Sequence, residues 1–140
     1  MEIINEKISL KTKGNVDIHN LTSAIKFFVE KNNIKNGLTT IFISGATGAV
    51  TTMEYEQGLI KDTQEMFKKL VDENVKYNHD VSHIKGNAVS HLRASLVGPS
   101  LTVPVVDGVL QLGTWQEIVF IEFDNRPRDR EVLITILGNK

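Results

Sequence analysis

Short β-branched segments that end in turn residues recur along this chain, and they limit its fold more than any other feature. The strongest signal lies in residues 91–116, where Asp107-Gly108 joins two short apolar segments. Asp-Gly between two such segments predicts a tight β-hairpin. Further strands are predicted over residues 4–11, 16–20, 38–43, 49–55, 117–123 and 131–137. The chain should therefore be built mainly on antiparallel sheet.

Two stretches instead have a helical period. Leu21, Ala24, Ile25, Phe28 and Val29 recur at i, i+3, i+4, i+7 and i+8, which places them on one face of a helix. A second amphipathic helix is predicted over residues 59–71, with apolar side chains on one face and charged ones on the other. Two amphipathic helices among seven or eight strand-like segments predict an α+β fold, a mainly antiparallel sheet or sandwich covered by the helices.

Composition excludes several classes of function. The 140 residues fit a single domain, 1–140, and the absence of cysteine excludes disulfides, thiolate nucleophiles and cysteine-based zinc sites. A net charge of −1 creates no overall field for nucleic acid or an anionic membrane. No apolar run approaches the roughly 18 residues of a membrane span, and the N-terminus lacks a signal-peptide pattern. We expect a cytoplasmic protein without nucleic-acid or membrane partners.

Two connecting segments contain residue types that bind phosphate. Residues 44–48, Ser-Gly-Ala-Thr-Gly, lack the Gly-Lys-Ser/Thr ending of a P-loop. A plain strand-to-strand connection is therefore favoured, although a site loop is compatible with it. Residues 124–130 hold three arginines that could grip a phosphate, but Asp124 and Asp129 offset their charge and Pro127 stays out of the strand ladder. A solvated hairpin tip is favoured there over a ligand site.

The most polar stretch, residues 74–86, introduces a cluster of histidines. His79 and His83 are four residues apart, and His91 follows eight residues later. Histidines clustered without cysteine suit Zn²⁺ or another divalent cation. The spacing matches no fixed zinc pattern, so spacing alone favours a surface loop.

Residues 91–116, HLRASLVGPSLTVPVVDGVLQLGTWQ, resemble the YjbQ-like family, many of whose members carry the name secondary thiamine-phosphate synthase. Looser similarity extends from about residue 3 to residue 137. The resemblance implies a YjbQ-like fold and a homotrimer with sites near subunit boundaries. It also implies a metal-assisted transferase that joins hydroxymethylpyrimidine diphosphate to thiazole phosphate and releases pyrophosphate.

The same resemblance implies a metal site. Family segments with Tyr-x-His and His-[ILV]-[KR] match Tyr77-Asn78-His79 and His91-Leu92-Arg93, and the glutamate of a third segment matches Glu54. His79, His91 and Glu54 would then hold a divalent cation, zinc or magnesium. A further family histidine, in His-Thr-Ser-Ala-Ser, aligns with Gly45 and is absent here. His83 is a candidate replacement.

The remaining site residues are proposed on the same basis. Arg93 and Ser100, the latter in the Gly98-Pro99-Ser100 turn, would contact phosphate, while Trp115 or Tyr77 would pack on a substrate ring. Arg93 and Trp115 are thus the candidate catalytic residues. Because one family histidine is missing, an alternative is a non-catalytic protein that binds a metal or a small phosphorylated metabolite and reports it to a partner.

Overall fold

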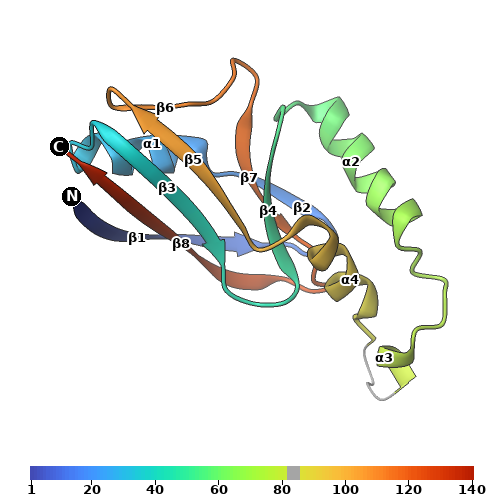
Figure 1. The fold of residues 1–140 in the computed structure, drawn as a ribbon. Helices are drawn as coiled ribbons and strands as arrows, with labels where there is room; N and C mark the ends of the chain where they lie inside the picture. The colour runs from blue at the N-terminus through green and yellow to red at the C-terminus, as the bar shows by residue number, and fades with distance from the viewer. Residues whose placement is uncertain (82–85) are drawn as a thin grey trace.

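The structure is a computed structural model that describes residues 1–81 and 86–140 (Figure 1). Within these ranges the elements, in chain order, are β1 (Glu2–Thr12), β2 (Asp17–Asn20), α1 (Thr22–Lys31), β3 (Asn36–Ile43), β4 (Gly48–Met53), α2 (Gln57–Leu70), α3 (Asn78–Val81), α4 (Ala88–Val97), β5 (Ser100–Val106), β6 (Val109–Leu110), β7 (Glu117–Glu122) and β8 (Arg128–Asn139). The α+β class and the predicted strands are confirmed, with ends that shift by a few residues.

The strands form two sheets, and every strand pair among the described residues is antiparallel. A five-stranded sheet has the order β1-β8-β3-β5-β6, and a three-stranded sheet has the order β2-β7-β4. The predicted hairpin joins β5 to β6, where Val106 pairs with Val109. Asp107 and Gly108 have φ angles of 49° and 81°, the two left-handed residues that a type I′ turn requires.

The two sheets pack face to face around the main core. Its buried side chains come from both sheets and include Ile41, Val103 and Ile134 from the larger sheet and Ile118 and Phe120 from the smaller. Helix α1 adds three further buried side chains to this core: Leu21 at its start, Ile25 and Val29. The predicted sandwich is therefore present, with α1 packed against the core between its sheets.

A second apolar cluster lies on the other face of the three-stranded sheet. There, Phe67 of α2 and Ala94 of α4 pack against Val119 and Ile121 of β7, with Phe67 and Phe123 in edge-to-face contact at 4.8 Å between ring centroids. The layers are thus the larger sheet, the smaller sheet and the helices α2 and α4 (Figure 1). None of the described helices is long and apolar enough to cross a membrane.

The sequence predicted two helices, whereas the described residues contain four. The helix α3 is a single turn. The ten-residue helix α4 buries Ala88, Ser90, Arg93 and Ala94, which are small or polar, so no apolar stripe at helical spacing marks it in the sequence. This helix carries His91 and thereby contributes to the site described below.

The segment between β7 and β8 is not the predicted solvated hairpin tip. The strand β7 belongs to the smaller sheet and β8 to the larger, so the chain crosses from one sheet to the other instead of turning back. The crossing buries Asp124, which is 2% exposed, and Arg130, which is 6% exposed. The prediction was wrong because two adjacent β-branched runs give no signal of a change of sheet.

Candidate functional site

Three connections between the sheets meet at one end of the sandwich. They are residues 13–16 between β1 and β2, 44–47 between β3 and β4, and 123–127 between β7 and β8. The pairing register places their ends together, because Glu122 lies opposite both Asp17 and Gly48, and Thr12 lies opposite Arg128. Side chains far apart in the sequence therefore converge at this end.

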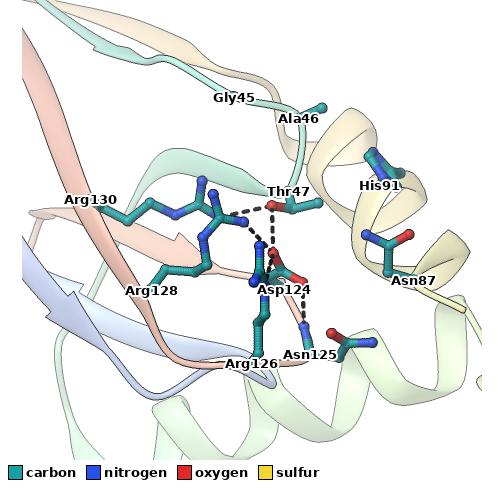
Figure 2. A pocket seen from close by; sticks show the side chains of 10 residues that line it. All are labelled: Gly45, Ala46, Thr47, Asn87, His91, Asp124, Asn125, Arg126, Arg128 and Arg130. Atoms are coloured by element: carbon teal, nitrogen blue, oxygen red, sulfur yellow. Dashed lines mark hydrogen bonds and ion pairs between the residues drawn. The ribbon is translucent and has the colours of Figure 1, made fainter. Parts of the chain in front are cut away.

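A cavity of about 470 Å³ opens there, between two of these connections and helix α4 (Figure 2). Its lining residues are Gly45, Ala46, Thr47, Asn87, His91, Asp124, Asn125, Arg126, Arg128 and Arg130. In Figure 2 the three arginines lie on one side of the cavity, and His91 of α4 and Asn87, which precedes this helix, face them. Residues from both phosphate-compatible segments, 44–48 and 124–130, line this one cavity.

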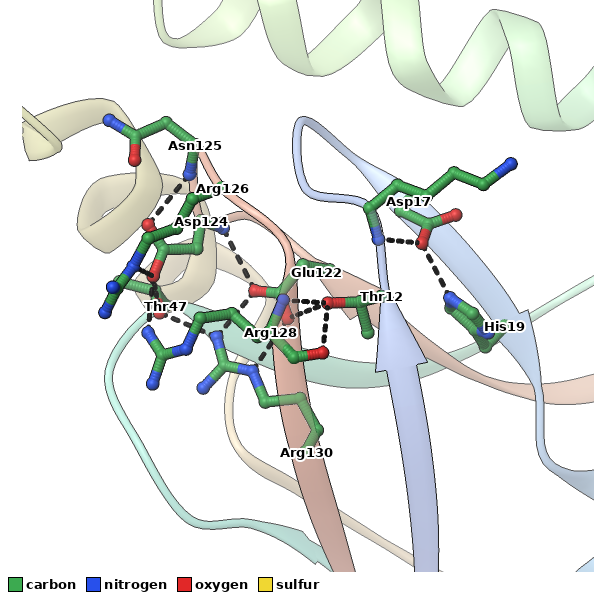
Figure 3. A network of polar contacts seen from close by, with 11 residues as sticks. Thr12, Asp17, His19, Thr47, Glu122, Asp124, Asn125, Arg126, Arg128 and Arg130 are labelled. Carbon is green, nitrogen blue, oxygen red and sulfur yellow. Dashed lines mark hydrogen bonds and ion pairs between the residues drawn. The ribbon is translucent and has the colours of Figure 1, made fainter.

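A buried ion pair fixes Arg130 in the wall of the cavity (Figure 3). Its Nε donates to Glu122 Oε2 at 2.7 Å, and its Nη2 donates to Glu122 Oε1 at 2.5 Å and to the Thr47 hydroxyl at 2.8 Å. The hydroxyl of Thr12 also donates to Glu122, at 2.8 Å. The hydrogen bonds to Glu122 raise the pKa of Arg130 above its usual range, so the guanidinium is permanently charged.

Asp124 organises the other two arginines. Arg128 Nη1 donates to its Oδ2 at 2.5 Å, and Arg126 Nε lies 3.9 Å from the same oxygen. The backbone N–H of Asn125 donates to Oδ1 at 2.8 Å. Burial favours the neutral acid, but the hydrogen bond from Arg128 and the neighbouring charges outweigh it and hold the pKa of Asp124 below its usual value.

The charges leave the site positive. Three guanidinium groups meet two carboxylates, and Glu122 is fully buried behind Arg130. Arg126 is 67% exposed and Arg128 is 31% exposed, so both extend toward solvent at the cavity mouth. Guanidinium groups fixed in this way bind planar or tetrahedral oxyanions through paired N–H groups. The arrangement is suited to an anionic ligand, phosphate above all.

The predicted metal ligands are only partly brought together. The rings of His79 and His91 are in edge-to-face contact with centroids 5.0 Å apart, and His79 Nε2 lies 3.0 Å from Asn87 Oδ1. Glu54 follows the far end of β4, six residues beyond Gly48, which at about 3.3 Å per residue is roughly 20 Å away. His83 lies outside the described residues.

The residues that the structure describes do not complete a metal site. Zinc sites take three or four protein ligands. The described chain contains no cluster of three or more histidine, aspartate or glutamate side chains that could hold a metal ion. Gly45 occupies the position of the implied family histidine and has no ligand atom in its side chain. The two imidazoles alone do not meet the requirement.

Arg93 points away from the cavity. It is 4% exposed, and its Nη2 donates to the carbonyl of Val71, the residue that ends α2, at 2.7 Å. Burial lowers the pKa of the Arg93 guanidinium, although the nearby Glu73 and Tyr77 act in the opposite direction. On helix α4, His91 and Arg93 are two residues apart and so lie on different faces. Arg93 therefore joins α4 to the end of α2.

Ser100 and Trp115 also lie outside the cavity lining. Ser100 is the first residue of β5, exposed and paired with Phe42 on the larger sheet. Trp115 is 72% exposed and precedes β7, whose first residue pairs with Met53. Trp115 and Glu54 therefore both lie close to the Met53–Glu117 pair, at the end of the smaller sheet opposite the cavity.

Most residues that line the cavity carry no local sequence signal that marks them as a site. The three arginines were noted but assigned to solvent, and Thr47 and Asn87 were not singled out. One available signal was the coincidence of two phosphate-compatible segments in one domain. The two segments lie close together because the chain crosses between the two sheets at this end. Local sequence patterns do not encode such crossings.

The fold and site define an α+β sandwich protein with an arginine-lined cavity at the end where three connections cross between its two sheets. The family profile described as "UPF0047 protein YjbQ-like" matches residues 6–139, and the chain belongs to this family. It is 37% identical to a UPF0047 protein of Methanothermobacter thermautotrophicus over 99% of this chain and 94% of that protein. Identity to one from Archaeoglobus fulgidus is 40%, over 94% and 99%.

Solved structures agree with this membership. A YbjQ-like protein of unknown function from Sulfolobus solfataricus superposes with a TM-score of 0.93 at 31% identity, covering 99% of both chains. A hypothetical protein from Aeropyrum pernix superposes with a TM-score of 0.90, also at 31% identity, covering 99% of this chain and all of that one. The resemblance inferred from residues 91–116 is therefore confirmed at the level of family and fold.

Proposed function

We propose that this protein binds a small phosphorylated metabolite in the arginine-lined cavity. The observation that carries the proposal is the convergence of Arg126, Arg128 and Arg130 on one cavity of about 470 Å³. That volume lies within the range of small-molecule sites, about 300–1,000 Å³. Asn87 and His91 supply further polar groups across the cavity, which could fix the orientation of a bound ester.

The finer proposal is the reaction of a secondary thiamine-phosphate synthase. Joining hydroxymethylpyrimidine diphosphate to thiazole phosphate forms one bond at the carbon that carries the diphosphate, breaks its C–O bond and releases pyrophosphate. The negative charge that develops on the leaving pyrophosphate must be neutralised. In this proposal the three arginines do so and His91, at the cavity wall, donates a hydrogen bond to a phosphate oxygen. A divalent cation at His79 and His91 stays a prediction.

A second candidate is binding without turnover, in which the cavity holds the metabolite and signals its presence to a partner. The observation that favours this reading is Gly45 in the position of the implied family histidine, together with the lack of a complete metal site in the described chain. Both candidates require the same anionic ligand. They differ in whether product forms.

We further propose that copies of the chain assemble through the outer face of the larger sheet, as the implied homotrimer requires. Leu38 is 46% exposed, Phe42 42%, Leu137 39% and Ile3 70%. Leu137 pairs with both Ile3 and Leu38, and Phe42 lies four residues farther along β3, on the same face of the sheet as Leu38. Burying such side chains favours association. Cytoplasmic location and the absence of nucleic-acid partners stay predictions.

The test combines ligand binding with a direct product assay. Inorganic pyrophosphate should raise the melting temperature of the wild-type protein, by several degrees once its concentration exceeds Kd about 100-fold. Arg126→Met should weaken binding about tenfold or more, because it removes a charged hydrogen-bond donor to the ligand. The fold should stay intact, since the side chain of Arg126 is largely exposed. Lys61→Met, on the exposed face of α2, is the matched control and should bind like wild type.

Thiamine phosphate formation from the two half-substrates is then measured with and without added divalent metal, on wild type and His91→Ala. Product from wild type but not from His91→Ala would support the synthase. Pyrophosphate binding without product under any metal would leave the non-catalytic candidate. If pyrophosphate has no effect on wild type, the phosphate-binding proposal is rejected.

A further inference from the structure

The backbone at Gly45 is arranged around a guanidinium group. Gly45 has a φ angle of +127°, a conformation that residues with side chains rarely adopt. A Cβ atom built there would lie only 3.1 Å from Arg130 Nη1. A larger side chain at this position would therefore strain the backbone and crowd the arginine at the same time.

Arg130 has little freedom to move aside. Three of its N–H groups are used by Glu122 and Thr47, and its side chain is only 6% exposed. The remaining terminal nitrogen, Nη1, is the one nearest Gly45, and it has no hydrogen-bond partner among the described residues. The glycine thus leaves open the one edge of Arg130 from which it can still donate to a ligand.

The local charge opposes a metal ion in the same space. Arg126, Arg128 and Arg130 all line the cavity, and the carboxylate that faces it, Asp124, is engaged by Arg128 and by the Asn125 backbone. The three guanidinium groups outnumber the two carboxylates, Glu122 and Asp124, so the net positive charge would repel a divalent cation in the cavity and attract a phosphate.

We infer that this chain binds the phosphate of its ligand through arginine side chains alone, without a metal ion, and that Gly45 is the residue that permits it by exposing Arg130 Nη1. The inference rests on the proposed function and specifies its chemistry. It assigns to Gly45 a role in ligand binding that its lack of a side chain conceals. Arg128 and Arg126 complete the recognition from the cavity mouth.

The test is isothermal titration of the full-length protein with inorganic pyrophosphate, once in buffer with EDTA and once after addition of one equivalent of Zn²⁺. Metal-independent binding predicts dissociation constants that agree within about twofold between the two conditions. Arg126→Met should raise the constant at least tenfold in EDTA, and Lys61→Met, on the exposed face of α2, should leave it within twofold. Gly45→Ala should weaken binding several-fold, and circular dichroism verifies that this variant folds.

The outcomes separate the inference from the function on which it rests. Binding that disappears in EDTA and returns with Zn²⁺ would overturn the inference while the phosphate site stands. Unchanged binding in Arg126→Met would overturn it as well, since the arginine side chains would then not be what holds the phosphate. No binding of pyrophosphate in either buffer would reject both the inference and the proposed function.

Discussion

Replacing Arg130 by methionine should strongly destabilise the fold, because it leaves a buried carboxylate without its partner. Glu122 has no exposed surface, and its two oxygens accept 2.7 Å and 2.5 Å hydrogen bonds from Arg130. Breaking one side of a buried ion pair costs about 3–5 kcal/mol. For a domain of this size, that loss lowers the melting temperature by roughly 10–20 °C.

The double variant Arg130→Met/Glu122→Gln should be more stable than Arg130→Met alone. The glutamine removes the uncompensated charge and keeps an oxygen that can accept from Thr12, whose hydroxyl lies 2.8 Å from Glu122 Oε2. The remaining cost should be about 1–3 kcal/mol, that of a buried neutral group with fewer partners. Lys7→Met, which breaks a pair with Glu131 that is 64% exposed on both sides, is the control and should cost under about 1 kcal/mol.

Urea unfolding followed by far-UV circular dichroism measures these differences. The fluorescence of Trp115 is a poor probe, because this side chain is 72% exposed in the folded state. If Arg130→Met costs less than about 1 kcal/mol, or if adding Glu122→Gln lowers the stability further, then the buried ion pair does not stabilise the fold.

Three further predictions concern other parts of the molecule. Arg93→Met should lower the free energy of unfolding by about 1–3 kcal/mol, through loss of its hydrogen bond to Val71, and leave pyrophosphate binding unchanged; weakened binding in a titration would return Arg93 to the site. The lowered pKa of Asp124 means that its stabilisation is complete above the ordinary aspartate pKa of about 4 and is lost as the pH falls through the lowered value. Thermal melts across this acid range should therefore show a weaker pH dependence for Asp124→Asn, and an unchanged curve would contradict the assignment. Phe42→Lys should reduce the sedimenting mass from about three times 15.7 kDa to a single copy, and a monomeric wild type would refute assembly through this face.

The sequence predicted those parts of the fold that local chemistry determines. The turn at Asp107-Gly108 adopts its expected left-handed angles because few other residue pairs tolerate them. The helices α1 and α2 follow their apolar periodicity. By contrast, the sequence did not predict α4, because its buried face contains small or polar residues such as Ala88 and Ser90 and so shows no apolar periodicity. Packing against the rest of the fold buries these residues.

The site was predictable only in part, for a related reason. His79 and His91 are close in the sequence and do meet in space, with ring centroids 5.0 Å apart. Glu54 matched a family segment, yet it follows the opposite end of β4. Asp124 and Asp129 were predicted to offset the charge of the three arginines. The convergence of these arginines on one cavity depends on β7 and β8 belonging to different sheets, and no local sequence pattern indicates that arrangement.

The position of the cavity follows from the path of the chain. Three of the connections between the sheets, residues 13–16, 44–47 and 123–127, cross the same end of the sandwich, so residues as distant as Thr12 and Glu122 share one hydrogen-bond network there. Gly45 lies in a connection and not in a strand, so a change at this position removes no ladder hydrogen bond and no core side chain. The chemistry of the site can therefore vary while the sandwich persists. A TM-score of 0.93 to a relative therefore establishes the shared fold and leaves the ligand of the cavity to be decided by its own lining residues.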